Sequence, residues 1–250
     1  MIKKINLYKG ESIITFDEGR HIFRDPEGKV IPSVTKATGI IDKSGPLMGW
    51  TAKTIVKWIR KNTNKCDKNV IDNNEYYLVT EDDLERAKKE YRRLKTEAAD
   101  IGTEIHEWAS DWIKGKKPDM PSNEKVVGGI TAFLKFQKEH KVKWLESERI
   151  IYSRKYNFAG ILDAVGIINK ELVLIDFKSS NGIYDDMRFQ VSGYQIAYEE
   201  ETGKKFDRRM ILRFGKEDGM FEITELDEEK KDKKIFLACL QIVNRIKELK

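Results

Sequence analysis

Two apolar stretches decide the fold: Gly160-Ile161-Leu162-Asp163 opens the first, and Leu174-Ile175-Asp176-Phe177-Lys178 closes the second. They belong to the apolar runs 159–168 and 172–177, which are separated by a short polar turn at Asn169-Lys170. Apolar runs of this length on either side of a short turn predict two strands paired as a β-hairpin. The pairing could bring Asp163 of the first strand close to Asp176 of the second.

The charged residues of this hairpin stand in otherwise apolar strands. Asp176 and Lys178 are two residues apart, so on one strand they share a face while Phe177 points into the core. A carboxylate in such a setting is costly to ionise unless a cation compensates it. Asp163, Asp176 and Lys178 would then converge on one patch, although an ordinary ion pair across a sheet would also account for Asp-x-Lys.

Two neighbouring carboxylates with open coordination positions suit Mg²⁺, which takes oxygen ligands and keeps several waters. Such an ion polarises a phosphoryl oxygen and lowers the pKa of a bound water. Lys178 would position or help deprotonate that water and offset charge in the transition state. The backbone carbonyl of Phe177 could supply a further hard ligand.

Composition limits the protein class. The 250 residues fit one sizeable domain or a domain with an added lobe, and the 40% hydrophobic content excludes a disordered chain. No apolar run approaches the roughly 18 residues of a membrane span, and Met-Ile-Lys-Lys lacks a signal-peptide core, so we expect a cytoplasmic protein with no membrane partner. The net charge of +5 permits nucleic-acid binding without demonstrating it.

Outward from the hairpin, periodicity predicts an α+β fold. The N-terminal forty residues read as β structure, with Asp25-Pro26-Glu27-Gly28 as a turn. Thr80 with Asp83 resembles a capping box that opens a long helix to about Gly115. Further helices are predicted near residues 47–61, 124–140, 185–201 and 227–249, and further strands at 145–152, 206–214 and 220–224. The last helix would be capped by Asp227 and bury Ile235, Cys239, Ile242, Ile246 and Leu249.

We expect two domains, 1–95 with the β-hairpin and helical lobe, and 96–250 with the core and closing helix.

Four further residues are candidates for the same site. His106 would overlie the small Gly102 on the long helix, leaving room for a metal or phosphate, although a lone helical histidine is more often structural. Gln190 and Tyr194 share one helix face, as a surface pair also would. Glu148 is a candidate ligand for a second ion, or a solvated glutamate.

The order of these motifs resembles a known family. Gly102-Thr103-x-x-His106, Gly160-x-x-Asp163, Asp176-Phe177-Lys178-Ser179 and Gln190-x-x-x-Tyr194 together resemble the nuclease module of the PD-(D/E)XK superfamily, in its RecB-like branch. The matched motifs span residues 102–198, and the predicted order of helix, three strands, helix and strand fits the restriction-endonuclease-like core of that family. Pro32-Ser33-Val34-Thr35 and the helix near Pro46-Leu47 resemble stand-alone phage exonucleases.

The resemblance implies a role for each motif. His106, Asp163, Asp176 and the Phe177 carbonyl would hold Mg²⁺ or Mn²⁺, and Lys178 would be the catalytic lysine. Gln190 and Tyr194 would line the DNA path, with Ser33, Thr35, Ser179 and Lys53 as further DNA contacts. Several relatives hold an iron–sulfur cluster with four cysteines, whereas this chain has only Cys66 and Cys239, so we expect no such cluster. Cys239 falls in an apolar helical pattern and is expected in the core.

The resulting hypothesis is a phage- or bacterium-type DNA exonuclease of repair or recombination, acting on single-stranded or end-bearing DNA beneath the helical lobe. Two alternatives stay open, a structure-specific endonuclease and a non-catalytic DNA-binding recombination protein on the same fold. Basic and aromatic residues fit a nucleic-acid groove or simply solvated helix faces and core tryptophans, among them Lys53, Lys57, Arg60, Lys61, Trp50 and Trp58.

Overall fold

The computed structural model describes residues 1–42, 44–66 and 76–249. Contacts between residues divide the chain into two compact units, Met1–Ile41 with Gly102–Lys250, and Asp42–Ile101. We call them the sheet unit and the arm. The long helix α3, Glu81–Ile113, runs from the arm into the sheet unit.

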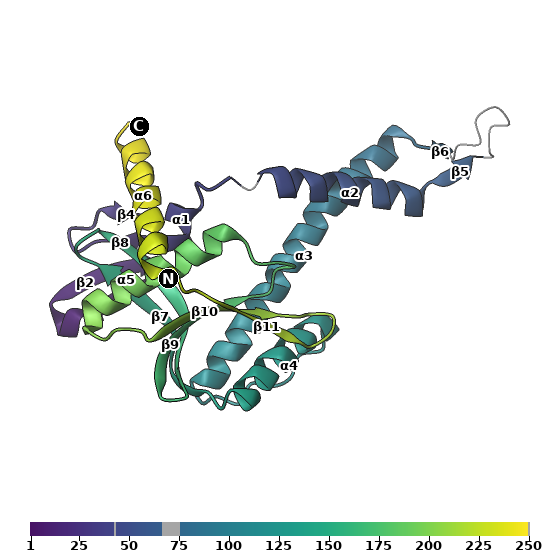
Figure 1. The fold of residues 1–250 in the computed structure, drawn as a ribbon. Helices are drawn as coiled ribbons and strands as arrows, with labels where there is room; N and C mark the ends of the chain where they lie inside the picture. Colours follow the sequence, from purple (N-terminus) through teal and green to yellow (C-terminus); the bar gives the residue numbers. More distant parts are fainter. Residues whose placement is uncertain (43, 67–75, 250) are drawn as a thin grey trace. The chain divides into compact units, whose positions relative to one another are not determined.

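A mixed five-stranded sheet lies at the centre of the sheet unit, in the order β11-β10-β9-β8-β7 (Figure 1). All neighbouring pairs are antiparallel except β9 and β10, which are parallel because helix α5 crosses over between them. The predicted order of helix, three strands, helix and strand is therefore present, and the fold is α+β. The bounds are β7 Lys143–Ser153, β8 Phe158–Ile168, β9 Glu171–Lys178, β10 Arg208–Phe214, β11 Phe221–Glu225, α4 Glu124–Glu139, α5 Asp185–Thr202 and α6 Glu229–Glu248.

The hairpin of β8 and β9 is confirmed. Asn169 and Lys170 both have positive φ, 52° and 72°, as a two-residue turn of type I′ requires to match the twist of the strands. Ala164 pairs with Ile175, so Asp163 and Asp176 stand opposite each other one residue further along the hairpin. This register places both carboxylates at the open end of the hairpin, away from the turn.

Helices cover both faces of the sheet. Leu174 and Ile211 point to one face, where they form the main core with α1 (Val34–Thr38), α5 and α6. Phe177 and Phe214 point to the opposite face, where their rings pack against Phe133 of α4 with centroids 5.9 and 6.1 Å apart. Both faces of β9 are therefore buried, which explains why the sequence of this strand is almost continuously apolar.

A small antiparallel sheet, β1-β2-β3-β4, packs on the outer strands of the large one. Its apolar side chains contact Tyr152 and Ala159, and the Tyr8 hydroxyl donates to the Tyr152 carbonyl at 2.9 Å. The turn expected at Asp25 is present, since the Gly28 N–H donates to the Asp25 carbonyl at 2.9 Å. The strands are β1 Ile2–Leu7, β2 Ser12–Asp17, β3 Ile22–Arg24 and β4 Val30–Ile31, with a short 3-10 turn at Tyr8–Gly10.

The N-terminal strands therefore belong to the same compact unit as the large sheet. The predicted division into domains 1–95 and 96–250 stays a prediction. The arm comprises α2 (Ser44–Asn62), the strand pair β5 (Asn64–Cys66) and β6 (Tyr76–Leu78), and the first part of α3. The expected cap of α3 is present, because the Thr80 N–H donates to Asp83 Oδ2 at 3.0 Å and the Asp83 N–H donates to Thr80 Oγ1 at 3.2 Å.

The predicted inward face of α6 was wrong. Cys239 is buried as expected, but Ile235, Ile242, Ile246 and Leu249 are exposed, and the buried residues of this helix include Phe236, Leu240 and Val243. Two apolar stripes run along this helix. The stripe that includes Phe236 packs into the core, where the centroid of the Phe236 ring lies 5.0 Å from that of the Phe158 ring. The predicted cap also shifts, since Glu228, not Asp227, precedes the first turn and makes no capping hydrogen bond.

The apolar residues along α3 are buried only in part. Ile101, Ile105 and Trp108 are buried, while Ala98 and Trp112 are exposed. Ile105 and Trp108 belong to the sheet unit, whereas Ile101 is the last residue of the arm. None of the helices in the described ranges has an apolar run long enough to cross a lipid bilayer.

Candidate metal centre

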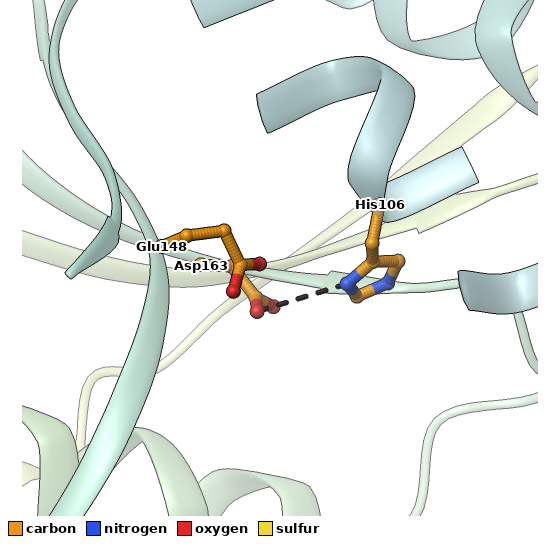
Figure 2. A group of neighbouring side chains, drawn as sticks. All are labelled: His106, Glu148 and Asp163. Carbon is orange, nitrogen blue, oxygen red and sulfur yellow. Dashed lines mark ion pairs between the residues drawn. The ribbon is translucent and has the colours of Figure 1, made fainter. Parts of the chain in front are cut away.

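Three side chains from separate elements converge at the open end of the β8–β9 hairpin (Figure 2). His106 comes from α3, Glu148 from β7 and Asp163 from β8, and each offers one ligand atom within 4.8 Å of the other two. His106 Nδ1 lies 3.7 Å from Asp163 Oδ1, as the dashed line in Figure 2 marks. One imidazole nitrogen and two carboxylates form a donor set for a divalent cation.

Asp163 is held in place by its neighbours on both sides. The Phe177 N–H donates to Asp163 Oδ2 at 2.7 Å, and the Ser147 hydroxyl donates to the Asp163 carbonyl at 2.9 Å. Burial raises the pKa of Asp163, but His106, Lys178 and the Phe177 N–H together outweigh burial and lower the pKa overall. The side chain is therefore an oriented carboxylate with Oδ1 directed at His106.

Glu148 adopts a backbone conformation that is unusual for its residue type. Its φ is 51°, although it lies within β7, between the pairs Ser147 with Ala164 and Arg149 with Leu162. A glutamate with positive φ costs on the order of 1 kcal/mol, and such residues cluster at functional sites. The register places Glu148 opposite Asp163. Burial, followed by the charge of Asp163, raises the pKa of Glu148 to about 7.

Asp176 and Lys178 form a second, deeper part of the site. The two side chains make an ion pair, and Asp176 is completely buried. No described residue donates a hydrogen bond to Asp176 Oδ1. Burial raises the pKa of Asp176 to about 6 despite the charge of Lys178. The pKa of Lys178 is raised, because the carboxylates of Asp176 and Asp163 outweigh the opposite effect of burial.

The space predicted beside His106 is occupied differently. A Cβ on Gly102 would lie 2.7 Å from Ser179 Oγ, so the small residue makes room for Ser179 rather than leaving an empty pocket. The His106 ring instead meets the Phe177 ring edge to face, with centroids 5.9 Å apart. Burial lowers the pKa of His106, but Asp163 outweighs this effect, so the net shift is upward.

Gln190 and Tyr194 form a pair on α5, because Gln190 Nε2 donates to the Tyr194 hydroxyl at 2.7 Å. Tyr194 belongs to the main core and is 4% exposed. Burial and, after it, the charges of Asp176 and Asp163 raise its pKa well above the usual value. The hydroxyl therefore lies near the carboxylates, while the ring supports the strand that carries Asp163.

Gly160 of the Gly-x-x-Asp motif lies beneath this ring. A Cβ at position 160 would come within 3.0 Å of Tyr194 Cε1 and 2.9 Å of Val34 Cγ2. We expect Gly160→Ala to destabilise the protein by about 1–3 kcal/mol, because the core must open to admit a methyl group. Urea denaturation measures this change. Gly182→Ala is the matched control, since its Cβ would meet only Tyr184 atoms at 3.9 Å, and an equal loss in both variants would contradict the close-packing account.

The remaining predicted residues lie in different places. Ser33 caps α1 by accepting from the Lys36 N–H at 3.1 Å, and its hydroxyl lies 3.0 Å from that of Thr35. Lys53 belongs to the arm. Ser147 was not predicted from the sequence, because it belongs to none of the motifs. Its hydroxyl reaches the Asp163 carbonyl only because β7 pairs with β8 in this register.

A divalent cation fits these residues on two observations. His106, Glu148 and Asp163 place one nitrogen and two oxygen donors together, and Asp176 leaves a buried oxygen without a hydrogen-bond donor among the described residues. The carboxylates of Glu148 and Asp163 repel each other, which a bound cation would relieve. His106, Glu148 and Asp163 would hold the ion, with Asp176 beside Lys178 as a further oxygen donor.

Comparisons with known proteins add only weak likenesses. Neither a protein-family model nor a curated protein sequence matches this chain. Similar solved structures include SSO0001, 14% identical over 48% of this chain and 62% of that one, with a TM-score of 0.29. This chain therefore matches less than two thirds of the length of SSO0001. The alkaline exonuclease LHK-Exo from Laribacter hongkongensis is 14% identical over 61% of this chain and 92% of that one, with a TM-score of 0.30. LHK-Exo in complex with dAMP is 16% identical over 58% and 85%, also with a TM-score of 0.30.

Proposed function

We propose that this protein is a divalent-metal-dependent deoxyribonuclease with a restriction-endonuclease-like core, and that it acts as an exonuclease on single-stranded or end-bearing DNA. One observation carries the proposal: the cluster of His106, Glu148 and Asp163 stands beside the buried pair of Asp176 and Lys178. A cation site next to a buried ammonium group matches a phosphodiester substrate, because both can neutralise charge on a phosphoryl group.

The bound ion would be Mg²⁺ or Mn²⁺, whose preference for oxygen donors and tolerance of one imidazole suit this donor set. When bound, it supplies a Lewis acid for a phosphoryl oxygen and a water of lowered pKa. Asp163 is oriented for this role by the Phe177 N–H and Ser147. Glu148 supplies a ligand for the same ion or for a second one.

Lys178 would stabilise charge rather than accept a proton. The raised pKa keeps its side chain an ammonium at neutral pH, and Asp176 restricts its position. A fixed ammonium beside the metal donors can donate to a phosphoryl oxygen as negative charge builds up in the transition state. We therefore assign Lys178 the electrostatic role and not that of the base that deprotonates water.

The choice of DNA rests on the ordered motifs that resemble RecB-like nucleases. In this proposal Gln190, Ser33, Thr35 and Ser179 contact the strand, and Tyr194 acts mainly by supporting Gly160 from the core. The pathway would be repair or recombination in a bacterial or phage-infected cell, with the protein in the cytoplasm.

The test compares end-labelled linear single strands with covalently closed circles of the same sequence, in Mg²⁺ or Mn²⁺. An exonuclease degrades only the linear strand and releases short products from one end. Digestion of the circle would identify an endonuclease instead. Binding of both substrates without hydrolysis in either metal would overturn the catalytic proposal and favour a DNA-binding recombination protein.

Metal binding should also stabilise the folded protein. We expect Mn²⁺ at about 100 times its dissociation constant to add about 2.7 kcal/mol to the free energy of unfolding, because the ion binds only the assembled ligands. Thermal melting with and without Mn²⁺ measures this effect. Glu148→Gln should reduce the shift, whereas Glu222→Gln, which removes an exposed partner of Arg213, should leave it unchanged. Equal shifts in all three proteins would show that the ion binds elsewhere.

A further inference from the structure

The arm carries a groove of its own. Helices α2 and α3 enclose a cavity of about 600 Å³ within residues 42–101. Lysines and tryptophans of α2 dominate its lining. The lining residues are Trp50, Lys53, Thr54, Lys57, Trp58, Lys61, Asn62, Glu90 and Leu94.

Three exposed lysines form a row along this groove. Lys53, Lys57 and Lys61 are four residues apart, so they share one face of α2 and advance about 6 Å along the helix axis at each step. None of them forms an ion pair with a described residue, in contrast to Lys88 and Arg93 on α3, which are paired with glutamates. The row is therefore available to a polyanion with charges at regular intervals.

The acidic residue of the lining does not cancel this row. Glu90 is held by the guanidinium of Arg93, with bonds of 2.7 Å from Nε and 2.8 Å from Nη2. Arg93 also pairs with Glu97, so it does not neutralise Glu90 completely, but Glu90 is a single acidic side chain among the lining residues, and the three lysines leave the groove with a net positive charge. A ligand with repeated negative charges matches this potential, whereas an apolar or basic protein segment does not.

Trp50 gives the groove a flat apolar surface. Its side chain remains 36% exposed, and Tyr91 contacts its ring with centroids 5.0 Å apart at an interplanar angle of 57°. This contact limits the orientation of the indole and leaves part of the ring open to solvent. An exposed indole beside a row of cations offers stacking for a base whose neighbouring phosphates face the lysines.

We propose that this groove binds single-stranded DNA, with backbone phosphates along Lys53, Lys57 and Lys61 and a base stacked on Trp50. The strand must be single because base pairing and stacking in a duplex hide the base faces from Trp50. The proposal rests on the proposed function for the choice of DNA, and adds a strand-binding site in the arm that requires none of the metal ligands.

The first experiment measures affinity without hydrolysis. Full-length protein in EDTA is titrated against a labelled oligothymidylate of about 20 nucleotides, longer than the roughly 4–16 nucleotides that a single-strand site covers. Lys53→Gln, Lys57→Gln and Lys61→Gln are combined in one variant. The matched control combines Lys89→Gln, Arg92→Gln and Lys95→Gln, three exposed cations of α3 that do not line the groove.

The salt dependence of binding distinguishes the two triple variants. Each phosphate contact contributes about 0.7 to the slope of log K against log salt, so losing three should lower the magnitude of the slope by about 2 and the affinity at least about tenfold near 100 mM salt. The control should lose much less of both. Equal losses in the two triple variants, or no loss in the groove variant, would overturn the proposal.

The second experiment tests the stacking surface. We expect Trp50→Ala to weaken binding of the oligothymidylate about 5- to 150-fold with an unchanged salt slope, and Trp50→Phe to retain most of the affinity. Binding of a duplex of the same length should be insensitive to Trp50→Ala. Equal loss for the duplex and the single strand would contradict base stacking.

Binding in EDTA separates this proposal from the proposed function. If the protein hydrolyses no DNA in any metal but the groove variants lose single-strand affinity as expected, the nuclease assignment fails and the groove stands. If hydrolysis depends on Asp163 while the groove variants bind normally, the groove fails and the nuclease assignment stands.

Discussion

Asp163→Asn is expected to lower DNA hydrolysis in Mg²⁺ or Mn²⁺ by at least about a thousandfold, because it removes both a ligand charge and the oriented oxygen that faces His106. The amide oxygen of asparagine can still accept the Phe177 N–H, which Asp163 Oδ2 accepts at 2.7 Å. The substitution therefore separates chemistry from folding.

Initial rates of acid-soluble nucleotide release from linear single-stranded DNA measure the effect of Asp163→Asn, across a range of Mn²⁺ concentrations. Glu222→Gln is the control, because it also removes one carboxylate charge from the sheet unit but at an exposed ion pair with Arg213. Near-UV circular dichroism checks that both variants are folded. Retention of more than about a tenth of wild-type activity in folded Asp163→Asn would rule out the ligand role.

Lys178→Met should have the second largest effect, on activity and on stability together. We expect hydrolysis to fall by about a hundredfold or more, since a fixed ammonium beside the phosphoryl group is lost. Folding should weaken by about 3 kcal/mol or more near pH 8, because Asp176 is left as an unpaired buried carboxylate.

The stability loss in Lys178→Met should depend on pH. Burial already raises the pKa of Asp176 to about 6 in the folded protein, above the ordinary value of 3.8, and removal of Lys178 raises it further. When the pKa of a carboxyl group is higher in the folded state, the free energy of unfolding falls as pH rises from the unfolded-state pKa to the folded-state pKa. Asp176 is protonated in the folded state of both proteins below about pH 6, so the variant should fall behind wild type mainly as pH rises above about 6.

Urea denaturation of wild type and Lys178→Met at several pH values from about 4 to 8 measures this difference. Lys155→Met is a suitable control, because that exposed lysine lies on the turn between β7 and β8 and its ammonium lies over the Tyr156 ring, 5.1 Å from the centroid, rather than in an ion pair with a described carboxylate. A pH-independent difference between Lys178→Met and wild type would show that Asp176 is not ionised in the folded protein.

The central hairpin was predictable from sequence because its constraints are local. Apolar runs on both sides of Asn169-Lys170 set the strands, and the turn set the register that places Asp163 opposite Asp176. The two-residue period of a strand predicted that Asp176 and Lys178 share a face, which their ion pair confirms. The cap of α3, formed by Thr80 and Asp83, was equally local and equally predictable.

The parts that escaped prediction depend on contacts between distant segments. The positive φ of Glu148 and the Ser147 hydrogen bond arise from the pairing of β7 with β8, which no local pattern encodes. The absence of a side chain at Gly102 predicted space for a ligand, but Ser179, the residue directly after β9, occupies that space. On α6, two apolar stripes compete, and only the fit of Phe236 against Phe158 decides which one is buried.

One measurement tests the metal centre most directly: an anomalous difference map from crystals of the protein soaked in MnCl₂. Our account predicts a manganese peak in contact with His106, Glu148 and Asp163, and loss of that peak in crystals of Asp163→Asn. Well-ordered side chains at this cluster with no manganese between them, in crystals of the active protein, would contradict it.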